Sequence, residues 1–320
     1  MAQKNSGYGI DALYEPLSKL KIIGAYQANT YYADLSGSPV KDKAIRAEFS
    51  WDRKAVKFRS YVQKAGAHFV AFGNPAVVGD RFTIDGALSV FPVSWYSLSL
   101  NVDQYRDNLE GDPNRTTTNQ RVINVGNAFQ FKTGTTVSLS GSQNTAKGSP
   151  STALDNQTNT LGLGFAQMIS RHSVSLNIQS SQFRDKNKNA HDLDTMTIGF
   201  SSSWRLPRSW SLTFGVTDSD TKDKIDGSKR SSLSVGPSLT VPLNARWSAQ
   251  YWGNYTATKN TSASFPADNA LTSLSSEFTW AQSKQVNITF GVGMNMNKDK
   301  INPANKYDEL TASMRYSYTF

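Results

Sequence analysis

Few side chains in this sequence have the types and spacing that catalysis needs. The chain has no cysteine, which excludes a thiol nucleophile, a thiolate metal site and a disulfide framework. Its three histidines are His68, His172 and His191, and none stands in a persuasive arrangement with a nucleophile. We therefore expect no enzymatic activity, no bound metal and no cofactor.

The acidic segment 218–223 has part of the pattern of a calcium-binding loop. Asp218, Asp220 and Asp223 are separated by polar residues, as the ligands of such loops are. Lys222, however, occupies a position where a ligand oxygen is needed. The sequence therefore predicts a solvated loop here and not a metal site.

The charge of the chain is strongly basic but dispersed. A net charge of +9 and an isoelectric point near 9.5 permit binding to nucleic acid, anionic lipid or acidic polysaccharide. Many basic residues lie in polar connectors such as 184–188 and 222–229, mixed with Asp, so we expect no nucleic-acid binding. Hydrophobic content is 38% with a mean hydropathy of -0.48, and no stretch approaches the roughly 20 apolar residues of a membrane-spanning helix.

The elements that must position any site are short runs of alternating residues. In Val286–Asn297, every second residue is apolar and the residues between are Asn, Thr or Gly. The segments Trp210–Thr217, Tyr96–Asp103 and Phe82–Val90 alternate in the same way. This period of two predicts β-strands with one apolar face and one polar face.

Short and long connections alternate along the whole chain. The short ones are centred near Leu17, Arg53, Val93, Gln130, Ile169, Pro207, Leu243 and Ser283. The long ones are strongly polar and cover residues 34–42, 106–118, 144–155, 184–192, 218–229, 258–269 and 297–308. A repeat of two strands, one short connection and one long connection predicts consecutive β-hairpins.

Three features favour a transmembrane barrel over a soluble sandwich, whose strands alternate in the same way. The polar face is rich in Ser, Thr, Asn and Gly rather than Lys and Glu, which suits a wall facing confined water. Short turns on one side and long loops on the other are typical of transmembrane barrels. Aromatic residues also gather beside the short connections, where an interfacial girdle belongs; they are Trp51, Trp95, Phe129, Trp204, Trp210, Trp247 and Trp280.

The C-terminal segment 309–320 is an alternating strand that ends in phenylalanine. One face carries Leu310, Ala312, Met314, Tyr316, Tyr318 and Phe320. This segment resembles the C-terminal recognition signal of Gram-negative outer-membrane β-barrel proteins, and the hairpin repeat extends the resemblance to nearly the whole chain. The resemblance implies that the barrel-assembly machinery reads Tyr316, Tyr318 and Phe320. It also implies a location in the bacterial outer membrane, in contact with its lipid and lipopolysaccharide.

The predicted fold is an all-β, transmembrane, antiparallel up-and-down barrel with short periplasmic turns and long extracellular loops. About sixteen strands follow from Leu20 onward, so residues 20–320 are expected to form the barrel. Residues 1–19 are an N-terminal segment or an extra strand, because the region from Tyr8 to Tyr14 also alternates. About eighteen strands result if an N-terminal part precedes it, since bacterial barrels have even numbers. Met1–Gly7 lacks the apolar core of a secretory signal, so either a signal has been removed or the chain is cut from a longer protein.

A pore-lining site is predicted around Lys64–Asp80, the least polar connection. An apolar loop is poorly placed outside the cell, so we expect it to fold inward and narrow the lumen. In this hypothesis Phe69 and Phe72 pack on the wall and Asn74 lies in the turn. A surface loop packed on its neighbours or on a partner is the alternative.

Charged residues on the presumed inward face surround this loop. Their charges would set ion selectivity, with a mild anion preference from the basic excess, or would only satisfy one another as ion pairs. These residues are Arg46, Glu48, Lys57, Arg59 and Asp85.

The sequence therefore favours a pore for small polar solutes or ions, with an anion preference. One alternative is the translocation barrel of a larger export or secretion system, with other subunits of that complex as partners. Another is a non-conducting barrel whose loops bind a partner at the cell surface.

Overall fold

The computed structural model describes residues 4–32, 38–70, 77–150, 154–283 and 285–319. These residues form seventeen β-strands and two short 3-10 turns, with no α-helix among them. Phe72, Asn74 and Phe320, which the sequence analysis singled out, lie outside the described residues. No helix in the described ranges is long and apolar enough to span a membrane.

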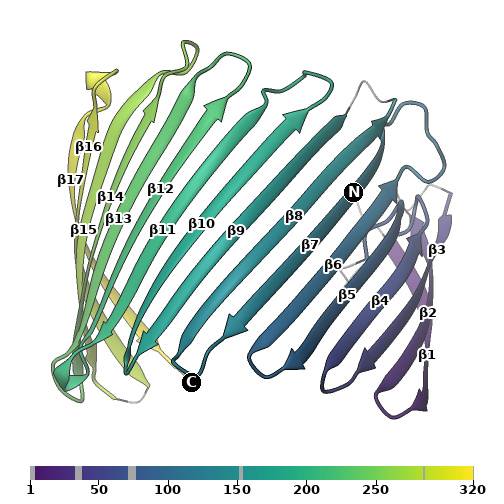
Figure 1. Cartoon of the computed structure of the whole chain (residues 1–320), viewed down its shortest axis with the longest axis horizontal. Helices are drawn as coiled ribbons and strands as arrows, with labels where there is room; N and C mark the ends of the chain where they lie inside the picture. The colour runs from purple at the N-terminus through teal and green to yellow at the C-terminus, as the bar shows by residue number, and fades with distance from the viewer. Residues whose placement is uncertain (1–3, 33–37, 71–76, 151–153, 284, 320) are drawn as a thin grey trace. The chain divides into compact units, whose positions relative to one another are not determined.

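The strands follow one another along the chain and are joined by alternating short and long connections (Figure 1). Their bounds are β1 (Lys4–Leu17), β2 (Leu20–Tyr32), β3 (Val40–Asp52), β4 (Val56–Ala65), β5 (Arg81–Val93), β6 (Tyr96–Asp107), β7 (Thr117–Gln130), β8 (Thr135–Ser149), β9 (Asp155–Ile169), β10 (His172–Asp185), β11 (Leu193–Arg205), β12 (Ser211–Asp223), β13 (Lys229–Pro242), β14 (Trp247–Asn260), β15 (Ala267–Ala281), β16 (Val286–Asp299) and β17 (Tyr307–Tyr318). The 3-10 turns are η1 (Pro207–Ser209) and η2 (Pro303–Asn305).

The strand count differs from the even number expected for a bacterial barrel. From Leu20 onward the described residues form sixteen strands, β2 to β17, as the hairpin repeat predicts. The segment before Leu20 is a strand as well, because β1 pairs with β2 from Lys4–Tyr32 at one end to Leu17–Leu20 at the other. The total in the described ranges is therefore seventeen.

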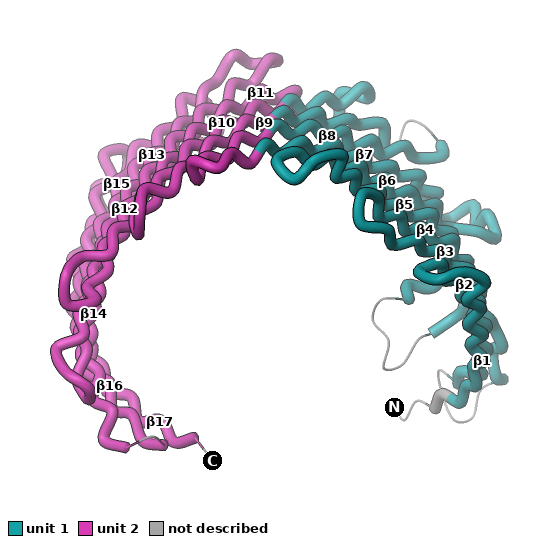
Figure 2. Tube along the Cα trace, turned by 60° about the horizontal axis from the view of Figure 1, so that its bottom comes forward, with its two compact units in different colours: residues 1–129, 139–161, 182–190 teal, residues 130–138, 162–181, 191–320 magenta. Residues whose placement is uncertain are grey.

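Contacts divide the chain into two compact units (Figure 2). Unit 1 contains residues 1–129, 139–161 and 182–190, and unit 2 contains residues 130–138, 162–181 and 191–320. Strands β8, β9 and β10, and the last residue of β7, are divided between the two units. Within unit 1, strands β1 to β7 pair in chain order, each antiparallel to the next. Strands β11 to β17 of unit 2 pair in the same way.

The short connections are tight turns that use backbone conformations with positive φ. Lys19 ends the turn between β1 and β2 with a φ of 71°. In the turn after β7, Gly134 has a φ of 79°, and its amide donates to the carbonyl of Phe131 at 3.1 Å. A Cβ at Gly134 would lie 3.0 Å from the carbonyl oxygen of Met168, so glycine is required there for space as well as for conformation.

The strand register keeps two faces separate in unit 1. On one face, Phe58 of β4 pairs with Trp51 of β3 and with Leu88 of β5. Its chain neighbour Arg59 pairs with Ser50 and Ala87 on the opposite face. We call these the apolar face and the polar face.

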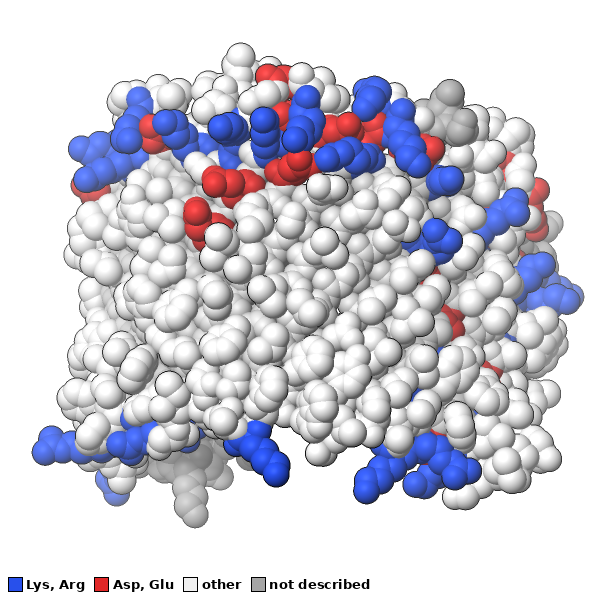
Figure 3. All heavy atoms as spheres, in the orientation of Figure 1, with Lys and Arg blue, Asp and Glu red and all other residues white. Residues whose placement is uncertain are grey.

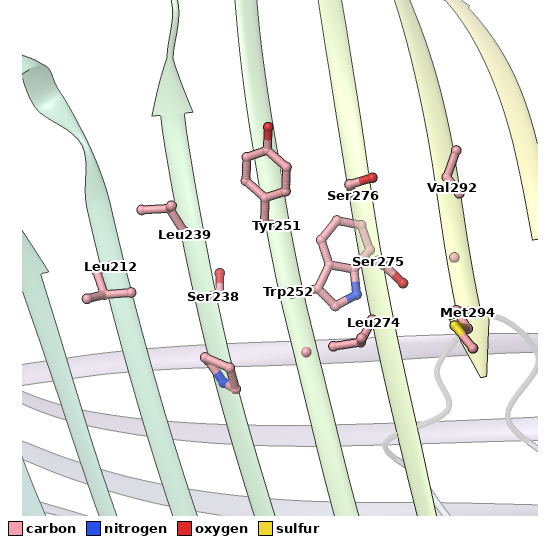
Figure 4. Close-up of a pocket in the computed structure, with 13 residues that line it drawn as sticks. Leu212, Ser238, Leu239, Tyr251, Trp252, Leu274, Ser275, Ser276, Val292 and Met294 are labelled. Carbon is pink, nitrogen blue, oxygen red and sulfur yellow. The ribbon is translucent and has the colours of Figure 1, made fainter. Parts of the chain in front are cut away.

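The same separation holds in unit 2, and Figure 4 shows its centre. Leu274 of β15 lies on the apolar face, opposite Gly253 and Met294. Ser275 lies on the polar face, opposite Trp252 and Gly293. The apolar face is hollowed here by about 510 Å³, and the side chains that line the hollow include Leu212, Leu239, Tyr251, Leu274, Val292 and Met294.

No second layer of structure covers the apolar face in the described residues. On both faces together, the described residues include only five buried hydrophobic residues: Ala44, Ala65, Phe69, Val241 and Ala249. Large apolar side chains are exposed instead, for example Val292 at 53% and Leu161 at 70%. A soluble domain buries such a face against another element, whereas a transmembrane strand turns it toward hydrocarbon.

Charged side chains avoid the middle of the strands on the face shown in Figure 3. Lysines, arginines and acidic residues gather toward the strand ends, and a broad band between them is nearly free of charge. A band of this kind is expected where strands cross lipid, because a charge at mid-depth is costly.

Leu274→Arg and Ser275→Arg test the assignment of the two faces. Leu274 is the central residue of β15, so an arginine there is expected to lower the free energy of unfolding in lipid vesicles by about 2–4 kcal/mol. Ser275→Arg places the same charge one residue away on the polar face, and we expect a much smaller loss. Denaturant titrations of both variants provide the measurement, and equal losses would contradict the assignment.

Candidate pore-lining site

The charged residues predicted to line a pore share the polar face of unit 1. Glu48 of β3 pairs with Tyr61 of β4, which pairs with Asp85 of β5. The guanidinium of Arg46 donates to Glu48 Oε2 at 2.7 Å and lies 4.1 Å from the centre of the Tyr61 ring. Arg59 approaches Asp85, with 3.6 Å between nitrogen and oxygen. The structure therefore brings these four charges and one tyrosine together.

Lys57, the fifth predicted residue, lies nearer the short-turn end of the same face. It pairs with Asp52, and the two charged groups are 3.8 Å apart. Both side chains are largely exposed, so this ion pair contributes little to stability. Lys57 is on the expected face but outside the cluster.

The cluster continues onto β6 and β7 through residues that the sequence analysis did not select. Asp103 lies opposite Asp85. Arg81 stacks on Tyr105, with 3.9 Å from its guanidinium to the ring centre, and the Tyr105 hydroxyl donates to Gln120 Oε1 at 2.7 Å. Arg81 lies at an even spacing from Asp85 along β5, and Tyr105 lies at an even spacing from Asp103 along β6. The alternation of each strand was therefore a sufficient signal to place Arg81, Asp103 and Tyr105 on this face.

The connection between β4 and β5 is anchored to the polar face at both described ends. Phe69 is 6% exposed and packs with Ala44 and Ala65, which lie opposite each other on that face. Asn29 Nδ2 donates to the carbonyl oxygen of Val70 at 2.9 Å. Phe69 therefore packs on the polar face, and the constriction of a lumen by this connection stays a prediction.

A close backbone approach explains the glycine at the start of this connection. The amide of His68 donates to Asp42 Oδ2 at 2.7 Å, which brings the Asp42 carboxylate against the chain. A Cβ at Gly66 would lie 1.8 Å from Asp42 Oδ1. Only glycine leaves room for this contact.

The end of the connection is tied to its neighbour by a buried aspartate. Asp80 is 7% exposed, and its Oδ1 accepts a hydrogen bond from the amide of Leu109 at 2.8 Å. Arg115 donates to Asp80 Oδ2 at 2.5 Å. A charge-assisted bond to a mostly buried carboxylate is among the stronger hydrogen bonds, so residues 77–80 and the β6–β7 connection hold each other in place.

The predicted girdle aromatics lie at the short-turn ends of their strands. Trp247 and Trp280 lie opposite each other and stack, with ring centres 5.7 Å apart and planes 8° from parallel. Trp95 stacks on Phe129 at 6.4 Å. Trp204 contacts His172 at 4.8 Å between ring centres, Trp51 pairs with Phe58 on the apolar face, and Trp210 follows η1.

The final strand has the alternation expected of an assembly signal, on the described part of the segment. Tyr316 lies opposite Ile288 and Tyr318 lies opposite Val286, both on the apolar face of β16. The two tyrosines are exposed at 62% and 46%. Their reading by an assembly machinery stays a prediction.

A histidine and two aspartates meet at the long-loop end of unit 2. His191 Nδ1 is hydrogen-bonded to Asp223 Oδ2, and Asp226 is 4.0 Å from the same nitrogen. Their ligand atoms lie within 4.8 Å of one another. Asp223 Oδ1 also accepts from the amide of Ile225 at 2.8 Å, so hydrogen bonds join the two long connections that carry this cluster.

Comparison with known proteins gives a fold but no sequence family: no family profile and no curated protein match this sequence. The solved copper transporter OprC is 10% identical with a TM-score of 0.58, over 99% of this chain and 63% of that protein. The siderophore receptor PirA from Acinetobacter baumannii is also 10% identical, with a TM-score of 0.54, over 99% of this chain and 58% of that one. The fold is that of outer-membrane β-barrel proteins.

The outer-membrane location expected from the sequence is supported by these neighbours. An anion-selective porin from Comamonas acidovorans also aligns with 99% of this chain and with all of its own length. It is 11% identical with a TM-score of 0.46, which is too low to bear on function.

The contact between His191 and Asp223 predicts pH-dependent order in the loops that carry them. The hydrogen bond from His191 to Asp223, together with the charge of Asp223, raises the pKa of His191 above its ordinary value. The contact therefore stabilises the folded loops fully below about pH 6.5, the unfolded value, and is lost as the pH rises through the raised folded value.

Hydrogen exchange provides the measurement. Amides 224–228 should exchange faster at about pH 8.5 than at about pH 5.5, after correction for the intrinsic rates. The control is His191→Gln, in which this dependence should vanish. If the pH dependence of amide exchange persists in His191→Gln, the contact between His191 and Asp223 is not its cause.

Proposed function

We propose that the strands close into a barrel in the outer membrane, and that its lumen conducts small polar solutes and ions. The observation that carries the proposal is the anchoring of the β4–β5 connection on the polar face. A loop held there by Phe69 and by Asn29 occupies the side of the wall away from lipid. Such a loop narrows a solvent-filled space, as the constriction hypothesis requires.

The composition of the polar face supports a hydrated lumen. In β16, the residues on this face are Asn287, Thr289, Gly291, Gly293, Asn295 and Asn297. Small hydroxyl and amide side chains form hydrogen bonds with water and leave space for it. A lumen filled by protein would need larger side chains to fill it.

The charges near the anchored connection show no basic excess. Arg46, Arg59 and Arg81 face Glu48, Asp85 and Asp103 on the polar face of β3 to β6. The basic excess lies on the apolar face of the same unit, toward the long-loop end, at Lys41, Lys43, Lys64, Arg106 and Arg121. This arrangement does not favour the anion preference expected from the overall charge, and we propose weak selectivity instead.

Deletion of residues 67–78 tests the pore and its constriction together. Purified protein in planar bilayers should form discrete conducting channels, and the deletion should raise the single-channel conductance because it removes material from the lumen. A matched control deletes residues 262–265 from the connection between β14 and β15, and we expect unchanged conductance. Channels that the first deletion leaves unchanged would rule out the constriction, and a protein that forms no channel would rule out the pore.

Reversal potentials under a salt gradient test the charge balance. The parent channel should give a potential close to zero, Asp85→Asn should shift it toward anion preference, and Arg59→Gln should shift it toward cation preference. The control variant Lys43→Gln changes a charge on the apolar face and should shift nothing. A strongly selective parent channel, for anions or for cations, would contradict the proposed balance.

A further inference from the structure

The long-loop end of the apolar face of β1, β2 and β3 carries a hollow that changes from basic to apolar with depth. The register defines three rows across these strands. The first row is Ser6, Thr30 and Lys41; the second is Tyr8, Ala28 and Lys43; the third is Ile10, Tyr26 and Ile45. Each row lies two residues nearer the middle of the strands than the one before.

The hollow is formed by a small residue between larger ones. Ala28 lies between Tyr8 and Lys43, and the volume over it is about 520 Å³. Below it, Tyr8 and Tyr26 face each other with ring centres 6.4 Å apart. The hollow therefore has basic groups at its upper edge and aromatic groups at its base, and the next row of residues below it is aliphatic at Ile10 and Ile45.

Within the described part of the chain, the basic groups have no counter-charge on their own face. Neither Lys41 nor Lys43 forms an ion pair within the described residues, and both side chains are exposed. Asp42 also lines the hollow, but its position in β3 belongs to the opposite face, and its carboxylate accepts hydrogen bonds from the amides of Lys43 and His68 at 2.7 Å. An anionic ligand at the hollow would therefore find two lysines that no carboxylate of the described residues already neutralises.

The same asymmetry extends along the unit. On described residues of β3 to β7, the apolar face also carries Lys64, Arg106 and Arg121 near the long-loop end. All acidic residues in the strands β1 to β7 lie on the polar face, and they are Asp11, Glu15, Asp42, Glu48, Asp52, Asp85, Asp103 and Asp107. The apolar face of β1 to β7 therefore carries only basic charges near the long-loop end.

We propose that this hollow binds a phosphate-bearing lipid of the surrounding membrane. Lys41 and Lys43 hold the phosphate of the headgroup, and Tyr8, Tyr26 and Ile45 contact the acyl chains below it. A cationic edge directly above an apolar base matches an amphipathic anion, whereas a free phosphate ion would use only the lysines. The proposal rests on the membrane-spanning orientation given above, in which the apolar face meets lipid.

Binding of bis-phosphorylated lipid A to the detergent-solubilised protein tests this site. Native mass spectrometry should show the lipid retained on the parent protein. The double variant Lys41→Gln/Lys43→Gln should bind it about 30-fold more weakly, because each lysine near a membrane surface contributes roughly a fivefold factor. A control with the same change in charge, Lys54→Gln/Lys132→Gln, alters two short-turn lysines and should bind like the parent.

Two further measurements separate the possible ligands. Ala28→Leu fills the hollow without changing charge, and it should weaken lipid A binding severalfold if acyl chains enter there. Inorganic phosphate in large excess should compete poorly. Complete displacement by phosphate would show an anion site without a lipid component, and self-association lost in Ala28→Leu would show a contact between two copies. Equal lipid binding by the parent and the lysine double variant would overturn the proposal.

Failure of this site is distinguishable from failure of the proposed pore. The lysine double variant should keep the conductance of the parent, because both side chains lie on the apolar face. A protein that binds lipid A through these lysines but forms no channel would refute only the pore. A conducting protein whose lipid binding ignores the lysines would refute only the site.

Discussion

The structure depends on the separation of apolar and small polar side chains onto opposite faces of its strands, with no further layer over the apolar face in the described residues. Backbone hydrogen bonds between neighbouring strands satisfy the peptide groups, so no backbone donor has to be buried elsewhere. The apolar side chains then have no partner within the protein. Hydrocarbon is the environment in which such a wall is stable, and this requirement explains the exposed leucines, valines and phenylalanines without any hidden core.

The separation of faces also determines where function can lie. On the polar face, charged residues form ion pairs and stack on tyrosines, as Arg46 does with Glu48 and Tyr61. The partly apolar connection between β4 and β5 packs on the same face, because Phe69 is buried there against Ala44 and Ala65. On the apolar face of strands β1 to β7, charge is confined to the long-loop end, where a lipid headgroup can reach it. The proposed pore and the proposed lipid site therefore both follow from the separation of the apolar face from the polar face.

Much of the fold could be predicted from the sequence because its signals are local. Alternation along Val286–Asn297 defines β16, and the two faces of that strand lie as the pattern indicates. The short connections predicted near Arg53, Val93 and Leu243 also coincide with short connections of the structure. The charged residues Arg46, Glu48, Arg59 and Asp85 share one face because their spacing in each strand is even.

The remaining features depend on which residues of neighbouring strands lie opposite each other. A shift of one residue exchanges the two faces of a strand, and the register of β3 against β4 follows from the exact turn at residues 53–55. Single-strand patterns therefore could not reveal that Phe69 packs between Ala44 and Ala65, or that Lys43 lies beside Ala28 and Tyr8. They could not reveal the total of seventeen strands in the described residues either. From the sequence, an extra strand was only one of two possibilities for residues 1–19, and the pairing of β1 with β2 shows that it is a strand.

The most direct test of the account is the accessibility of β16 in a lipid bilayer. Because the chain has no cysteine, single cysteines at positions 288–295 can each carry a spin label without background. The account predicts that oxygen, which concentrates in hydrocarbon, relaxes labels at Ile288, Phe290, Val292 and Met294, and that a water-soluble nickel complex relaxes labels at Thr289, Gly291, Gly293 and Asn295. Labels at the first four positions that neither reagent reaches would place those residues in a protein interior and would contradict the account.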